Sequence, residues 1–346
     1  MKYLKTGFFL FLTTGLLVCF SLSIEQSNFL FIINKDGKCG YIDQSGNIVI
    51  NPQYDNCRVF SNGLAAACVK DKWGLIDTKG TCKIGFKYDE IRWSFTEGLL
   101  PVRIGEKWGY IDTTGKLVLS AKYDYAHSFS EGRAVVLIGK KHGIINKDGE
   151  LISSLYDDSG WEFGEGLLSV ENKNKSGFID TNGNIAIPLQ YSRVKEFSEG
   201  LAAVKLSHDH NQWGYINNKG VLVIAHQFND AGYFKEGLAP VQINRKYGYI
   251  NNRGEIIIQP MFHHAYAFTE GLACFITDDG KYGYIDTKGV TVINPIYDLS
   301  FGFRNGLADV GIGKLQMEIS AGVTIGFDGK SGYIDKNGKV VWKPSK

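Results

Sequence analysis

The sequence predicts an all-β protein built as a tandem array of nine antiparallel β units, each about 34 residues long. Three observations support this prediction. A four-residue pattern, Gly followed by an apolar residue, Ile and then Asp or Asn, recurs nine times at a nearly constant spacing. Each copy has a further Gly three residues after its Asp or Asn. The composition, with 42 Gly, 7 Pro, 18 Tyr, 21 Phe and 6 Trp, suits many short strands joined by tight turns.

The first Gly of the pattern sets the period of the repeat. Successive copies are separated by 34, 35, 34, 34, 37, 34, 35 and 49 residues. A fixed period of this length is typical of repeat architectures, in which each unit packs against its neighbours. These glycines are Gly40, Gly74, Gly109, Gly143, Gly177, Gly214, Gly248, Gly283 and Gly332.

Each unit contains the elements of a hairpin. Asp-x-x-Gly between two apolar runs predicts a turn in which the Asp side chain caps the turn and the Gly supplies a positive φ. In the first unit these residues are Asp43 and Gly46, and the apolar run that follows covers residues 48–50. An aromatic residue, Tyr54, comes next, and a Phe-x-Glu/Asn-Gly segment beginning at Phe60 closes the unit. We therefore expect three short antiparallel strands and a loop anchored by aromatic side chains.

A single unit is too small to bury a core of its own, so the units are expected to stack. They could form an open array or close into a β-propeller. Propellers often interlock their ends, with one terminus supplying a strand to the last blade. Here the chain opens with the first strand of a unit, at residues 29–33, and ends after the third strand of the ninth, at residues 340–342. We therefore predict an open, twisted array, with a propeller as the alternative.

The same residues carry a family resemblance. Lys-Trp-Gly-Tyr-Ile-Asp at residues 107–112, together with the Trp-Gly pairs at 73–74 and 213–214, resembles the bacterial WG (or KWG) repeat family. The resemblance covers about residues 29–343. It implies β-rich repeats in proteins that are often exported, and it implies no common activity or catalytic residues.

The first 23 residues are predicted to be an export signal. Lys2 and Lys5 precede an apolar run that ends in small residues, and cleavage is expected after Ser23. A lipoprotein modified at Cys19 is the less favoured alternative, because the residue before it is Val18 rather than a small residue. The mature β domain is then residues 24–346, exported to the periplasm, the cell surface or the medium, with no membrane span.

Charge and composition limit the function. A formal net charge of +2, from 38 Lys and Arg against 36 Asp and Glu, argues against a nucleic-acid-binding protein. The absence of Cys-x-x-Cys spacing argues against a metal site of that type. Cys39, Cys57, Cys82 and Cys274 align with apolar positions of other units, and we expect them to be small buried hydrophobic residues. Cys39–Cys68 and Cys57–Cys82 disulfides remain open alternatives.

Two charged positions recur through the units. A Glu in the closing segment (Glu97, Glu131, Glu165, Glu199, Glu236 and Glu270) is interpreted as a group that caps turns and loops. A Lys two residues before the first Gly either keeps the protein soluble and its edges unpaired, or forms an interaction stripe for an anionic polymer. That candidate stripe consists of Lys38, Lys72, Lys107, Lys141, Lys175, Lys246, Lys281 and Lys330.

We find no catalytic residue, no cofactor site and no metal site that the pattern supports. His208 and His210 flank an Asp in the unit with 37-residue spacing, and a solvated turn is the favoured interpretation. The favoured hypothesis is a non-enzymatic exported module that binds a protein or an anionic polymer in the cell envelope. The alternatives are a glycan-acting enzyme, which would use Glu residues with Trp93 and Trp161, and a purely structural surface protein.

Overall fold

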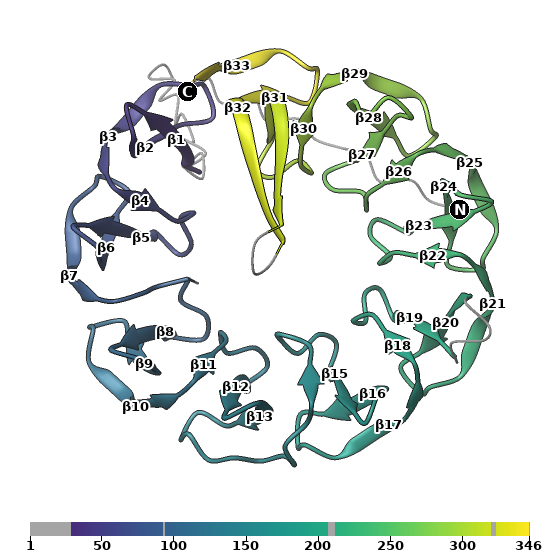
Figure 1. Ribbon diagram of the computed structural model, residues 1–346, viewed down its shortest axis with the longest axis horizontal. Coiled ribbons are helices and arrows are strands. Elements are labelled where there is room, and N and C mark those ends of the chain that lie inside the picture. Colours follow the sequence, from purple (N-terminus) through teal and green to yellow (C-terminus); the bar gives the residue numbers. More distant parts are fainter. Residues whose placement is uncertain (1–28, 93, 207–211, 320–322, 346) are drawn as a thin grey trace, which may run out of the picture.

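The computed structural model describes residues 29–92, 94–206, 212–319 and 323–345. These residues form nine small antiparallel sheets, and none of the described residues is helical. Figure 1 shows the sheets arranged in a ring, with one strand of each complete sheet at the rim and the others nearer the centre. The architecture is a nine-bladed β-propeller. The prediction of an all-β protein with nine repeated units is confirmed.

A complete blade has four strands in sequence order from the centre to the rim. The innermost strands have two residues each: β4 (Asn56–Cys57), β11 (Tyr125–Ala126), β14 (Asp158–Ser159), β18 (Arg193–Val194), β22 (Asp230–Ala231), β26 (His264–Ala265) and β30 (Leu299–Ser300). The second strands are β1 (Phe31–Lys35), β5 (Leu64–Val69), β8 (Leu99–Ile104), β12 (Ala134–Ile138), β15 (Leu167–Asn172), β19 (Leu201–Lys205), β23 (Leu238–Ile243), β27 (Leu272–Ile276) and β31 (Leu307–Ile319).

The third strand of each blade carries the repeated Gly-x-Ile pattern. These strands are β2 (Lys38–Ile42), β6 (Lys72–Asp77), β9 (Lys107–Asp112), β13 (Lys141–Ile145), β16 (Lys175–Asp180), β20 (Trp213–Asn217), β24 (Lys246–Asn251), β28 (Tyr282–Asp286) and β32 (Val323–Asp335). The rim strands are β3 (Ile48–Tyr54), β7 (Cys82–Tyr88), β10 (Leu117–Tyr123), β17 (Ile185–Tyr191), β21 (Leu222–Phe228), β25 (Ile256–Phe262), β29 (Thr291–Tyr297) and β33 (Val340–Ser345). Blade 4 has two isolated bridges, His142–Tyr156 and Ile145–Leu151, in place of a rim strand.

The turn between the third and rim strands has the predicted chemistry. In blade 1, Asp43 Oδ1 accepts the backbone N–H groups of Ser45 at 2.8 Å and Asn47 at 2.9 Å, and Gly46 has a φ of 86°. The first Gly of the pattern has a different role. A Cβ on Gly40 would collide with the backbone of Ile50 and its neighbours on the rim strand, so the close approach of these two strands requires glycine.

Aromatic side chains join each blade to the next. The ring of Tyr110 on β9 is fully buried, and Phe129 of blade 4 packs against it edge to face, with 5.0 Å between ring centroids. The Tyr110 hydroxyl also donates a hydrogen bond to the His127 carbonyl at 2.7 Å. The same hydrogen bond recurs for Tyr41, Tyr215, Tyr249 and Tyr284, each donating to the following blade. The closing Phe of a unit is thus a core residue of the junction between blades.

The ring closes where blade 9 meets blade 1. Tyr333 donates a hydrogen bond to the Ile32 carbonyl at 2.9 Å, and its ring lies 5.4 Å from that of Phe31. Gln44 Nε2 donates to the Asn305 carbonyl at 2.6 Å. The prediction of an open array is therefore wrong, and its alternative, the propeller, is right. Within the described residues each sheet is built from one continuous segment, as expected, and side-chain packing closes the ring with no strand exchanged between blades 9 and 1.

The long final spacing produces an extended hairpin in blade 9. Strands β31 and β32 pair over 13 residues each, from Leu307–Asp335 to Ile319–Val323. In the view of Figure 1 this hairpin points from blade 9 towards the middle of the ring. The insertion therefore lengthens an existing strand pair and adds no new element to the described part of the fold.

Three of the four cysteines that were expected to be small buried hydrophobic residues depart from that prediction. Cys39 and Cys57 form a disulfide, with 6.1 Å between their Cα atoms, that links strand β2 of blade 1 to strand β4 of blade 2. Neither disulfide considered from the sequence forms. Cys82 is exposed rather than buried, whereas Cys68 and Cys274 are buried thiols. Burial raises the pKa of Cys274 to about 12, so this thiol is inert. The prediction of a small buried residue therefore holds for Cys274. Cys39 and Cys57 are buried as predicted but are bonded to each other, and the prediction is wrong for Cys82.

Candidate functional site

The recurring lysines lie on the third strands of the blades, and most of those in the described residues have carboxylate partners. Five of these lysines each pair with the Asp that follows the recurring aromatic residue of the same blade, 16 or 17 positions later: Lys38, Lys72, Lys107, Lys141 and Lys281. Lys246 pairs instead with Asp278, at 2.6 Å. These ion pairs are exposed, so the charges remain hydrated and add little stability. The stripe as a binding surface for an anionic polymer stays a prediction. The ion pairs argue against it, because each paired Lys already faces a negative charge.

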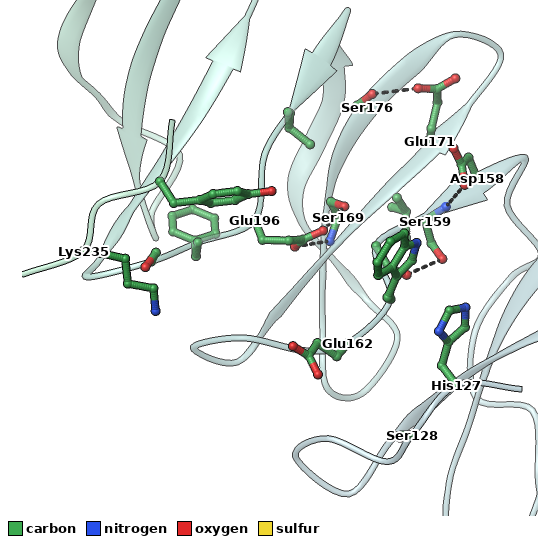
Figure 2. Close-up of a pocket in the computed structure, with 17 residues that line it drawn as sticks. His127, Ser128, Asp158, Ser159, Glu162, Ser169, Glu171, Ser176, Glu196 and Lys235 are labelled. Atoms are coloured by element: carbon green, nitrogen blue, oxygen red, sulfur yellow. Dashed lines mark hydrogen bonds between the residues drawn. The ribbon is translucent and has the colours of Figure 1, made fainter. Parts of the chain in front are cut away.

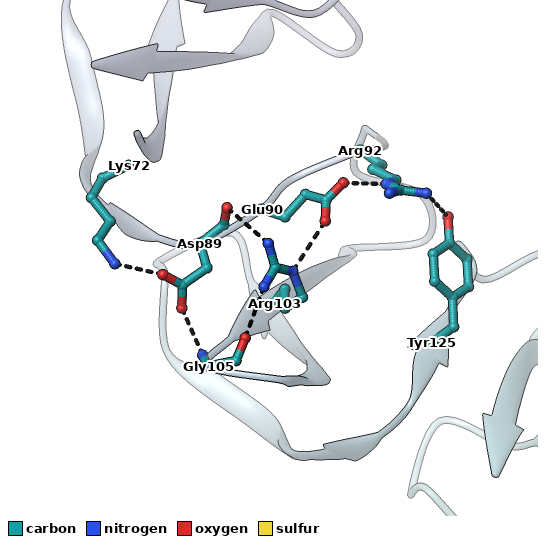
Figure 3. A network of polar contacts seen from close by, with 7 residues as sticks. All are labelled: Lys72, Asp89, Glu90, Arg92, Arg103, Gly105 and Tyr125. Atoms are coloured by element: carbon teal, nitrogen blue, oxygen red, sulfur yellow. Dashed lines mark hydrogen bonds and ion pairs between the residues drawn. The ribbon is translucent and has the colours of Figure 1, made fainter. Parts of the chain in front are cut away.

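The Lys72–Asp89 pair belongs to a wider polar network that joins blades 2 and 3 (Figure 3). Asp89 accepts the backbone N–H of Gly105 at 2.6 Å as well as the Lys72 ammonium, and Lys72 is the main reason that its pKa lies below the usual range. Arg103 Nε donates to Glu90 at 3.0 Å. The network holds the tip of the β8–β9 hairpin, at Gly105, against the connection between blades 2 and 3. Its positive and negative side chains are paired with each other within the protein.

The recurring glutamates bridge successive blades. Glu131 accepts the backbone N–H of Gly166 in the next blade at 3.0 Å, and Glu165 accepts that of Gly200 at 2.9 Å. Both glutamates have a positive φ, 51° and 56°, in the turn that closes the unit. The capping interpretation is confirmed, with the addition that each carboxylate caps the turn of the following blade. The other members of the series, Glu97, Glu199, Glu236 and Glu270, do the same.

A pocket of about 640 Å³ opens across blades 4 to 7. We name it the Trp161 pocket. It is lined mainly by the loops between the first and second strands of these blades, which we call inner loops. His127 comes from blade 4, Trp161 and Glu162 from blade 5, Glu196 from blade 6 and Lys235 from blade 7. Figure 2 shows His127 and Lys235 on opposite sides of the pocket, with both glutamates between them.

The carboxylate of Glu196 is held in place inside this pocket by hydrogen bonds and close packing. Its carboxylate accepts hydrogen bonds from the Ser169 hydroxyl at 2.5 Å and from the Ser169 backbone N–H at 3.4 Å. Burial is the main reason that the pKa of Glu196 is raised above its usual value. A Cβ on Gly160 would collide with this carboxylate, so the glycine leaves the space that Glu196 occupies.

Trp161 provides an exposed aromatic surface beside these acids. Its side chain is 68% exposed, although large aromatic residues are normally well buried. The ring is nearly parallel to that of His127, with 6.1 Å between centroids and an angle of 15°. Burial, with help from His142 and Arg92, lowers the pKa of His127 to about 4. His127 is therefore neutral at pH 7, and the lining charges are those of the carboxylates and Lys235.

A second pocket, of about 750 Å³, lies at the closure between blades 9 and 1. Exposed Phe29, Val59 and Phe301 line it together with Asp309 and Tyr333. Asp309 lies on β31, and burial raises the pKa of its carboxyl to about 6. This pocket is more apolar than the Trp161 pocket, and Asp309 is the one carboxylate among its described lining residues.

Most residues that the sequence suggested for metal binding or export lie outside the described part of the structure. No group of three or more His, Cys, Asp or Glu side chains within the described ranges is arranged to hold a metal. The His208 and His210 pair lies outside the described residues, as do the predicted signal at 1–23, Cys19 and Trp93. No helix in the described ranges has the length and apolar character that a membrane span needs.

Comparison with known proteins identifies the repeat. The family described as "WG containing repeat" matches residues 40–73, 73–108, 108–141, 177–207, 213–247, 247–282 and 282–315, which is more than half of the chain. The chain belongs to the WG-repeat family. The predicted resemblance is thus confirmed. Among curated proteins, none matches this WG-repeat protein.

Solved structures resemble the fold of this WG-repeat protein at low sequence identity. A crystallised eukaryotic initiation factor is 12% identical and has a TM-score of 0.65, over 90% of this chain and 95% of that one. BamB from Moraxella catarrhalis is 10% identical with a TM-score of 0.41, over 76% and 92% of the two chains. At 12% identity, the similarity to the initiation factor shows a shared fold and nothing about function.

Sequence reasoning singled out Trp161 but missed most of its surroundings. Glu196, Gly160 and Ser169 were not candidates, because none belongs to a repeated pattern. One signal was available: the segment from Asp157 to the closing Phe163 is one residue longer than the corresponding segment in most units. That extra residue marks the inner loop of blade 5 as a departure from the repeat.

Proposed function

We propose that this WG-repeat protein is an exported, non-enzymatic binding module that holds a protein or polymer partner in the cell envelope through the Trp161 pocket. The observation that carries the proposal is the 68% exposed Trp161 in a pocket of about 640 Å³. Pockets that combine aromatic surface with a few placed polar groups are the usual ligand sites of rigid folds. The repeated charged residues, by contrast, mostly have partners within the protein.

The Cys39–Cys57 disulfide supports the export part of the proposal. Disulfides persist in oxidising compartments and are rare in the cytosol. The basic and apolar start of the sequence, at residues 1–23, fits the same route. Intact-mass measurement of the protein recovered from cells should give a chain beginning at Ile24 without lipid. A diacylated chain beginning at Cys19 would contradict the unmodified export that we propose.

The binding proposal predicts that envelope association depends on Trp161. We expect the mature chain to sediment with isolated envelope fragments, and Trp161→Ala to reduce the bound fraction several-fold, because this change removes the aromatic surface without disturbing the core. Phe301→Ala is the matched control, since Phe301 is also exposed and also lies two residues before a closing Phe. Equal sedimentation of all three proteins would contradict the proposal.

A glycan-acting enzyme is the second candidate, and one observation favours it. Glu162 and Glu196 line the same pocket as Trp161, and glycosidases use paired carboxylic acids of which one has a raised pKa. An enzyme of this type should release soluble sugar from the envelope fragments, and Glu196→Gln should stop the release. Binding without sugar release supports the non-enzymatic module.

A further inference from the structure

We infer that the Trp161 pocket takes a lysine or arginine side chain carried by a basic segment of a partner protein. The inference rests on the proposed function, because it names the partner chemistry for the same pocket. Four carboxylates line the pocket, those of Asp158, Glu162, Glu171 and Glu196, and Lys235 is the one cationic side chain among its described lining residues at neutral pH. The excess of acidic over basic side chains in the pocket attracts a basic segment and repels an anionic polymer.

The protein builds the same kind of contact within two other blades, blades 2 and 6, from its own residues. Arg58 lies over the ring of Trp73, with 4.8 Å from its guanidinium carbon to the centroid. Lys195 lies 5.1 Å from the centroid of Trp213 and also pairs with Asp230 at 3.3 Å. A cation over a Trp face therefore recurs in this ring, and at Trp213 the same cation also pairs with a carboxylate.

Trp161 occupies the repeat position of these cations, two residues before the closing Phe. Blade 5 therefore carries an aromatic ring where blades 2 and 6 carry a cation, and Ser176 stands where those blades carry Trp73 and Trp213. Arg92 lines a small hollow together with Tyr125, His127 and Trp161, but its guanidinium lies over the Tyr125 ring and pairs with Glu90. Figure 2 shows Lys235 across the pocket from His127. A cation from a partner would meet at Trp161 the same two kinds of group, an aromatic ring and a carboxylate, that Lys195 meets at Trp213 and Asp230.

The depth of the pocket suits a long side chain. Glu162 is exposed near the entrance, whereas Glu196 lies deeper, against Gly160 and Ser169. An aliphatic stem can therefore lie along Trp161 while the charged end reaches a carboxylate. Asp158, whose side chain is 69% exposed, offers a further contact to a neighbouring basic residue of the same segment.

The test uses fluorescein-labelled octalysine and measures its affinity for the folded mature chain by fluorescence anisotropy. We expect Trp161→Ala to weaken binding by about fivefold to tenfold, as the loss of one cation–π contact predicts. Glu162→Gln should weaken it by a similar factor. Two controls should bind octalysine as the parent does: Phe301→Ala, the exposed aromatic residue in the equivalent position of blade 9, and Glu106→Gln, which removes an exposed charge in blade 3.

The outcomes separate this inference from the proposed function. If octalysine binds equally to the parent and to Trp161→Ala, or does not bind at all, the inference is wrong. A neutral N-acetylglucosamine oligomer or labelled octaglutamate that binds in a Trp161-dependent manner, while octalysine does not, would overturn the cationic partner and leave the binding module in place. If none of the three probes binds in a Trp161-dependent manner and envelope sedimentation is also unaffected, both the inference and the proposed function fail.

Discussion

Removing the Cys39–Cys57 disulfide should lower the free energy of unfolding by about 3 kcal/mol. The bond closes a loop with a sequence separation of 18, and a crosslink over a loop of this size restricts the unfolded chain by roughly that amount. It also joins blades 1 and 2 next to the closure of the ring. Urea unfolding of the parent, with and without reductant, measures the effect, and Cys39→Ala combined with Cys57→Ala should reproduce it.

The remaining thiols provide the control for this prediction. Cys68→Ala and Cys274→Ala remove buried thiols that form no disulfide, so each variant should keep the response of the parent to reductant. The double variant should no longer respond. If the unfolding midpoint of the parent is the same with and without reductant, the disulfide is absent, and Cys39 and Cys57 are two separate buried thiols as the sequence predicted.

Asp309→Asn is expected to stabilise the protein at neutral and alkaline pH by up to about 3 kcal/mol. The folded state raises the pKa of the Asp309 carboxyl from 3.8 to about 6 by burial. The folded protein therefore holds this proton more tightly than the unfolded chain does. The protonated Asp309 carboxyl therefore contributes most to stability below pH 4. This contribution is lost as the pH rises through 6, because the folded protein then carries a charged carboxylate in a poorly hydrated position. A shift of about two units corresponds to the stated energy.

The measurement is urea unfolding of the parent and of Asp309→Asn from pH 4 to pH 8. The two proteins should differ little at pH 4 and most at pH 8, where the variant carries no buried charge. Asp36→Asn is the control, because Asp36 is exposed in a turn with a positive φ that Asn also tolerates. A difference between parent and Asp309→Asn that does not change with pH would show that the carboxyl titrates normally.

The blade could be predicted from the sequence because its chemistry is local. The cap that Asp43 places on its turn and the positive φ of Gly46 involve residues at most four positions apart. The role of the glutamates was predicted only in part. A turn-capping group was expected, but the turn that Glu131 caps belongs to the next blade, 35 residues later. A single unit contains no information about which of its positions meet the following unit.

Closure of the ring and the disulfide depend on that missing information. Whether nine units close is determined by the angle between blades, which is set by packing such as that of Phe129 on Tyr110. The repeat alignment placed Cys39 and Cys57 in separate positions, and only the fold shows that these positions face each other across a junction. His142 and Ser159 confirm the geometry, since they occupy the same two positions and hydrogen-bond at 2.9 Å.

The closed ring is the central claim, and a crosslink across its closure tests it most directly. Gln44→Cys and Asn305→Cys replace two residues that are hydrogen-bonded although 261 positions apart. The background carries Cys82→Ser, which removes the exposed native thiol. A short bifunctional thiol reagent should join the two new cysteines within one folded molecule, and the denatured chain should then migrate faster in a gel. A monomer that reacts at both cysteines but never forms the internal crosslink would show that blade 9 does not meet blade 1.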